Sequence, residues 1–169
     1  IMHLVPLLTD QGFSLEFATS VLMVLMVFGA FGRIFGGILG DRIGALPGYI
    51  LMSLGQTIFV IWFPDLVSPT TIYVMAALFG FTYSGVMSSI LVCTRMMVPA
   101  NYGARAMSLT SFFGWIGMGL GGFLGGYFFD IYGNYNWAFT FAGLSGVINL
   151  IILSFFFLYI RRAERLVLN

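Results

Sequence analysis

The sequence has very few charged residues and no lysine. Of its 169 residues, 8% are charged and 60% are hydrophobic, and the mean hydropathy is +1.01. A soluble domain needs more polar residues than this to cover its exterior. With no lysine and a formal net charge of +1, the chain also lacks a basic surface for nucleic acid. The composition therefore predicts an integral membrane protein that binds no nucleic acid.

Cysteine and histidine each occur once, as Cys93 and His3. A single cysteine excludes an intramolecular disulfide, and no His/Cys cluster has the spacing of metal ligands. Intramembrane serine proteases need a histidine on a helix after the serine, whereas His3 precedes the serine of Ser84-Gly85. We therefore expect no metal, no cofactor and no enzymatic activity.

Long apolar runs, separated by charges and turn residues, make up most of the chain. They predict helices over residues 17–40, 46–63, 71–94, 106–129 and 137–160. Ser14 and Glu16 form a start signal before the first of these. Residues 1–8 are too short to span a bilayer, which needs about 20 residues. We interpret them as the outer end of a truncated helix, with a short re-entrant segment as the alternative. The prediction is one all-α membrane domain with about six helices.

Two of the apolar runs carry the same ladder of glycines, each followed by Asp-x-x-Gly. The first ladder consists of Gly29, Gly32, Gly36, Gly37 and Gly40, and the second of Gly114, Gly117, Gly121, Gly122 and Gly125. Glycine allows the backbones of two membrane helices to approach closely, where lipid provides no hydrophobic driving force for association. The ladders therefore predict helix packing and an internal duplication.

Outside the apolar runs, arginine is confined to alternate turns. The arginine-bearing turns hold Arg42, Arg95, Arg105, Arg161, Arg162 and Arg165, and the other turns hold Asp10, Glu16, Asp65 and Asp130. Arginine is enriched in cytoplasmic loops, so the first set is expected to be cytoplasmic. The two ladders then run in opposite directions. This predicts inverted repeats over residues 1–63 and 71–160, with residues 161–169 as a cytoplasmic tail.

The turn Gly37-Ile-Leu-Gly40-Asp41-Arg42-Ile43-Gly44 resembles the G-x-L-a-D-R-x-G signature of the major facilitator superfamily. The resemblance implies the C-terminal half of a twelve-helix transporter, with the N-terminal half as its missing partner. Ala45, Leu46 and Pro47 depart from the basic residues that usually follow the signature, as is common in C-terminal halves.

A finer resemblance is to the monocarboxylate and oxalate/formate branch. It rests on His3-Leu-Val-Pro6 before Asp10-Gln-Gly12-Phe-Ser14, and on Gly29-x-x-Gly32-Arg33. In that branch an arginine at this position is associated with binding the substrate carboxylate. Oxalate exchangers also use a lysine in the helix that corresponds to residues 106–129, and this chain has none.

Arg33 is the main candidate for substrate binding, because it is the only charged residue inside a long apolar run. A buried arginine usually faces the bundle interior or an aqueous cavity, and its planar fork suits a carboxylate. The alternative is that Arg33 extends toward the cytoplasmic interface, about 12 Å away at helical rise. Ser84, Ser88 and Asn149 are further candidates that either line the pathway or bond between helices.

The signature turn is expected to act as a gate. The candidate gating residues are Gly37, Asp41, Arg42 and Gly44. Asp41 is expected to pair with Arg95 or Arg105 in one state of the transport cycle. A plain solvated turn is the alternative. His3 is a candidate for proton coupling, since histidine titrates near neutral pH; a hydrogen-bonded or interfacial histidine is the alternative.

These patterns together predict a secondary transporter for a small organic anion, working by alternating access with proton coupling or exchange. We expect it in a bacterial inner membrane, with lipid, the anion, a proton and the N-terminal half as partners. The alternatives are a carrier of the same fold for a sugar, drug or other solute, and a half-size subunit that acts as a dimer.

Overall fold

The computed structural model describes residues 2–167, with side chains over residues 2–162, and this part of the chain contains helices but no strand. The α-helices are α1 (Leu4–Asp10), α2 (Leu15–Ile43), α3 (Ala45–Trp62), α4 (Pro69–Met96), α5 (Gly103–Tyr132) and α6 (Asn136–Val167). Two short 3-10 helices, Phe63–Asp65 and Ala100–Tyr102, lie in connections. All the α-helices except α1 are long and apolar enough to cross a membrane.

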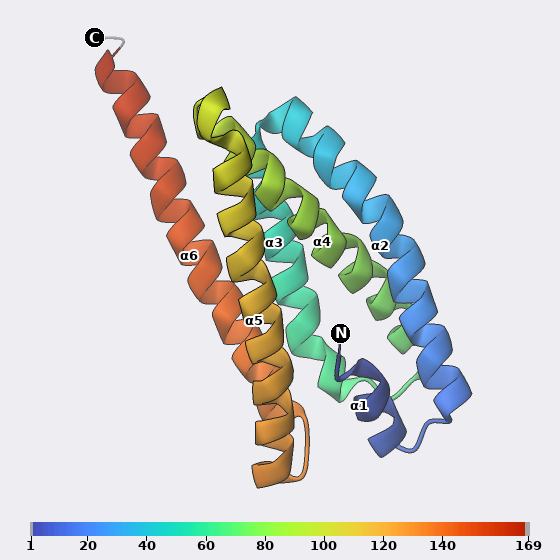
Figure 1. Ribbon diagram of the computed structural model, residues 1–169. Coiled ribbons are helices and arrows are strands. Elements are labelled where there is room, and N and C mark those ends of the chain that lie inside the picture. The colour runs from blue at the N-terminus through green and yellow to red at the C-terminus, as the bar shows by residue number, and fades with distance from the viewer. Residues whose placement is uncertain (1, 168–169) are drawn as a thin grey trace.

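The five long helices run alternately up and down (Figure 1). α2 and α5 are antiparallel, so the turn after α2 and the turn after α5 lie at opposite ends of the bundle, as inverted repeats require. The ends of α2, α4 and α6 and the start of α5 lie together at one end (Figure 1). Arg42, Arg95, Arg105, Arg161 and Arg162 all lie in these segments, so the arginines outside the middle of the helices are gathered at one end.

The charged turns are shorter than the sequence predicts. α2 continues through Asp41 and Arg42, and only Gly44, with φ +96°, separates it from α3. α5 likewise includes Arg105 and Asp130 before ending at Gly133, which is left-handed. The predicted boundaries were wrong here because a charged side chain at a helix end reaches the polar interface without interrupting the backbone. The predicted tail also begins as helix, since α6 continues to Val167.

Buried side chains gather in two clusters. One joins α1, α2 and α4 around Leu8, Val21 and Ile72. The other joins α3, α4 and α6 around Met52 and Leu153. α5 contributes little to either, because its buried residues are Gly103 and Gly125. The bundle therefore has a tight side, formed by α2, α3 and α4, and a loose side at α5.

Candidate functional site

The first glycine ladder is the closest helix–helix contact of the fold. Gly29, Gly32, Gly36 and Gly40 are all buried. A side-chain carbon on Gly32 would overlap the backbone carbonyl of Phe81 on α4. A side-chain carbon on Gly80 would in turn overlap the backbone of Leu25 on α2. α2 and α4 therefore touch backbone to backbone, and this contact fixes the position of the residues between the glycines.

The serines of α4 follow the same contact. The hydroxyl of Ser84 lies against Gly29, and the hydroxyl of Ser88 donates to the Ser84 carbonyl at 3.5 Å. The neighbouring Ser89 is buried and donates to the carbonyl of Gly36 at 3.5 Å. Both predicted substrate serines, Ser84 and Ser88, are thus half-buried beside the α2–α4 contact.

Arg33 lies on α2 among the ladder glycines, but its side chain is exposed. Among the described side chains, no carboxylate lies within 4.0 Å of its guanidinium. Tyr83 lies on α4 between Phe81 and Gly85, which face Gly32 and Gly36 on either side of Arg33. About 15 Å of helix separate Arg33 from Ile43, where α2 ends. The structure therefore presents an unpaired cation on the surface of α2, well inside an apolar span.

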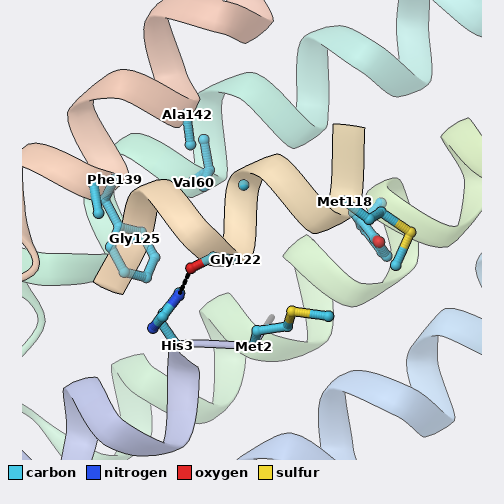
Figure 2. Close-up of a pocket in the computed structure, with 11 residues that line it drawn as sticks. Met2, His3, Val60, Met118, Gly122, Gly125, Phe139 and Ala142 are labelled. Atoms are coloured by element: carbon cyan, nitrogen blue, oxygen red, sulfur yellow. Dashed lines mark hydrogen bonds between the residues drawn. The ribbon is translucent and has the colours of Figure 1, made fainter. Parts of the chain in front are cut away.

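His3 lies in the wall of a small cavity of about 220 Å³, which is also lined by Met2 and by residues of α3, α4, α5 and α6. In Figure 2 its ring points at Gly122, and its Nε2 donates to the Gly122 carbonyl at 2.8 Å. A carbonyl only accepts, so Nε2 carries the hydrogen. A side chain on Gly125 would overlap the His3 ring. Tyr83 also lines this cavity, so the cavity of His3 reaches the segment of α4 that packs beside Arg33.

The second glycine ladder does not pack against a helix in the described part of the chain. Nothing lies within 4 Å of a side-chain carbon placed on Gly114, Gly117 or Gly121. Gly122 and Gly125 instead face the side chains of Met2 and His3. Within these residues the ladder faces no helix backbone, so helix packing at Gly114, Gly117 and Gly121 stays a prediction. α5 does contact α4, but near the start of α5, where the hydroxyls of Thr94 and Thr110 are hydrogen-bonded at 3.2 Å.

Asn149 lies on α6 and bonds to α3. Its amide donates to the Ser53 hydroxyl at 2.8 Å, and the Tyr49 hydroxyl donates to its oxygen at 3.5 Å. Because α6 and α2 are at opposite edges of the bundle (Figure 1), the structure does not bring Asn149 and Arg33 together. Sequence reasoning missed Ser53 and its neighbour Thr57, although their helical spacing places both on one face of α3.

The predicted gate residues lie at the arginine-bearing end. Asp41, Arg42, Arg95 and Arg105 are all exposed, and a side-chain carbon placed on Gly37 would meet no neighbouring element within 4 Å. The side chain of Arg95 lies over Gly103, at the start of α5. Among residues 2–162, Asp41 forms no ion pair with Arg95 or Arg105. The pair that the sequence suggested is thus not formed in this structure.

Comparison with known proteins identifies the fold. The family model described as Major Facilitator Superfamily matches residues 1–168. The chain belongs to the major facilitator superfamily. Its all-helical bundle, with a short first helix and five helices apolar enough to span a membrane, confirms the fold class predicted from the sequence.

Two curated relatives are transporters of this superfamily. Monocarboxylate transporter 13 of Rattus norvegicus is 33% identical over 168 residues, which is 92% of this chain and 38% of the relative. The riboflavin transporter of Saccharomyces cerevisiae is 36% identical over 87 residues, 50% of this chain and 17% of the relative. The chain thus spans well under half of either relative. No solved structure matches it.

The superfamily and the five membrane-spanning helices place this chain among integral membrane proteins. Within that class, the residues described above fall into two groups. Arg33, Tyr83 and His3 lie along α2, α4 and α1, whereas Asn149 and Ser53 join α6 to α3. Only the first group combines an unpaired cation with a titratable side chain.

Proposed function

We propose that this chain is the C-terminal half of a secondary transporter for a small organic anion, and that Arg33 contacts the carboxylate of that anion. The observation that carries the proposal is the exposed, unpaired guanidinium of Arg33 within the apolar α2. A charged side chain at the centre of a membrane helix costs about 2.5–3.5 kcal/mol on insertion scales. An anionic substrate would offset that cost, and its carboxylate would form two parallel hydrogen bonds with the guanidinium group.

The α2–α4 contact gives Arg33 a rigid support. The glycines on either side of it, Gly32 and Gly36, are held against the backbone of α4. Ser84 and Ser88 follow Tyr83 along α4, beside the same contact, and serve as neutral hydrogen-bonding groups near the anion. The missing N-terminal half supplies the facing wall, and the two halves rock about this midplane site.

Coupling to a proton is assigned to His3. Its bond to the Gly122 carbonyl ties α1 to α5, and Tyr83, which also lines its cavity, lies on the segment of α4 that packs beside Arg33. Exchange of one anion for another is the alternative mode. The end of the bundle that carries Asp41, Arg95 and Arg105 is cytoplasmic, and Asp41 pairs with one of these arginines in the opposite state of the cycle.

A neutral solute is the second candidate substrate. It is favoured by the similarity to the riboflavin transporter, which covers half of this chain. In that case Arg33 has a structural role and extends toward the interface. The two candidate substrates predict different competitors for uptake, and different effects of replacing Arg33 on that uptake.

The test measures uptake of radiolabelled lactate, formate and oxalate by the full-length protein in proteoliposomes. We expect Arg33→Gln to lower anion uptake about tenfold or more, because a hydrogen bond to a charged group contributes about 1.5–3 kcal/mol. Arg33→Lys keeps the charge but loses the planar guanidinium group, so we expect a loss of uptake smaller than that of Arg33→Gln. Arg162→Gln, at an exposed arginine on α6, is the matched control. Unchanged uptake in both Arg33 variants, or competition by riboflavin or sugars alone, would remove Arg33 from the site.

A further inference from the structure

A second and larger cavity lies inside the bundle, away from Arg33. Its volume is about 530 Å³, and its walls come from α3, α4, α5 and α6. That volume is within the range of pockets that bind drug-sized molecules. α2, which carries Arg33, does not contribute to its walls.

One wall of this cavity is polar and almost fully hydrogen-bonded. Asn149 is bonded to Ser53 and Tyr49, and the hydroxyl of Thr57 donates to the Ser53 carbonyl at 2.8 Å. Gln56 is the exception: its side-chain oxygen is buried and has no hydrogen-bond partner. A buried acceptor left without a partner costs about 1–3 kcal/mol, and the hydrocarbon core supplies no water to satisfy it.

The opposite wall is apolar and belongs to α5. It consists of Leu120, Leu124 and Phe128, together with the open glycines Gly117 and Gly121. Among the described residues that line the cavity, none is Asp, Glu, His, Lys or Arg. An anion would lose its hydration here without meeting a counter-charge, which is strongly unfavourable. The lining therefore selects a neutral molecule with one hydrogen-bond donor and a hydrocarbon part.

We propose that this cavity binds a neutral, hydroxyl-bearing amphiphile. Its hydroxyl donates to the side-chain oxygen of Gln56, and its hydrocarbon part lies against the apolar wall of α5. The site is separate from the anion site proposed on α2, and its ligand is not the transported anion. Occupancy would also bridge α5 to α3, on the loose side of the bundle.

The experiment uses 3-azioctanol, a neutral eight-carbon alcohol with a photoreactive diazirine, on the purified protein in nanodiscs. After irradiation, peptide mass spectrometry locates the adducts. We expect them on peptides that contain Gln56 and Asn149, or on the facing wall of α5. 1-Octanol should displace the probe, whereas octanoate at pH 8, which has the same chain but a negative charge, should not. Equal competition by octanoate, or adducts spread evenly over lipid-facing helices, would overturn the proposal.

A pair of matched variants tests the assigned hydrogen bond. Gln56→Leu removes the acceptor at similar volume, and should lower labelling of the cavity about fivefold, the value of one ordinary hydrogen bond. Gln11→Leu makes the same change at an exposed residue at the end of α1, and should leave labelling unchanged. Unreduced labelling of folded Gln56→Leu would contradict the proposal. The competition between octanol and octanoate needs no variant, so it remains decisive if Gln56→Leu does not fold.

Discussion

The two glycine ladders have the same spacing in the sequence and opposite environments in the structure. On α2 the ladder is buried and touches the backbone of α4 at several positions. On α5 the equivalent glycines Gly114, Gly117 and Gly121 are open. Both segments are apolar and both are long enough to span a membrane. Composition and spacing alone therefore do not decide which ladder is packed.

The difference comes from the helix that faces each ladder. α4 presents Gly80 and Gly85 toward α2, so each helix has room for the backbone of the other. α5 meets no such helix in the described chain, and only the side chains of Met2 and His3 contact its ladder, at Gly122 and Gly125. A glycine ladder thus indicates that close packing is permitted, and a second glycine pattern on the partner is needed to achieve it.

The largest expected effect is on Gly32. Gly32→Ala places a methyl group where the Phe81 carbonyl lies, and neither backbone can move without separating α2 from α4. We expect a loss of about 2–3 kcal/mol in unfolding free energy, the upper part of the usual range for overpacking. Thermal unfolding of the purified protein in detergent measures it.

Gly117→Ala is the matched control on α5, since its added methyl group meets nothing within 4 Å in this chain. Its unfolding temperature should stay close to that of the parent protein. Equal destabilisation by both substitutions would show that the second ladder is also packed, against a segment outside this chain, and the contrast between the ladders would disappear.

A smaller effect is expected at Gly125, where the neighbour is a side chain. Gly125→Ala would overlap the His3 ring, which can rotate away but then loses its 2.8 Å bond to Gly122. The expected cost is about 1 kcal/mol, the value of one hydrogen bond. In a His3→Ala background the same substitution should cost almost nothing. If Gly125→Ala lowers the stability of the His3→Ala protein as much as that of the parent, then Gly125 is constrained by something other than His3.

The sequence was sufficient to predict the class of fold and the antiparallel relation of the ladders, because hydropathy and charge segregation directly reflect the bilayer. It also placed the start of α2, where Ser14 accepts from the backbone of Phe17 at 3.2 Å. It did not predict the bond between His3 and Gly122, which joins residues 119 positions apart in the sequence. Nor did it separate Asn149 from Arg33, because no local pattern states which helices are neighbours.

The smallest expected effect concerns Tyr135, in the turn between α5 and α6 and beside His3. Its ring stacks on Phe129 at 4.6 Å, and burial, followed by the charges of Asp10 and Asp130, raises the pKa of Tyr135 above its ordinary value of 10.0. The folded protein therefore favours the neutral phenol. The resulting stability is present below about pH 10 and is lost as the pH rises further, because the unfolded chain gives up its proton first.

Tyr135→Phe should remove this alkaline decline while leaving the outer end of α5 packed. Thermal unfolding between about pH 8 and pH 11 compares the two proteins. The stability advantage of the parent protein over Tyr135→Phe should shrink as the pH rises. Tyr159→Phe, at an exposed tyrosine on α6, should leave the decline unchanged. An identical pH dependence in Tyr135→Phe and the parent protein would mean that the turn after α5 opens before the phenol ionises, and that the loose side of the bundle extends to its outer end.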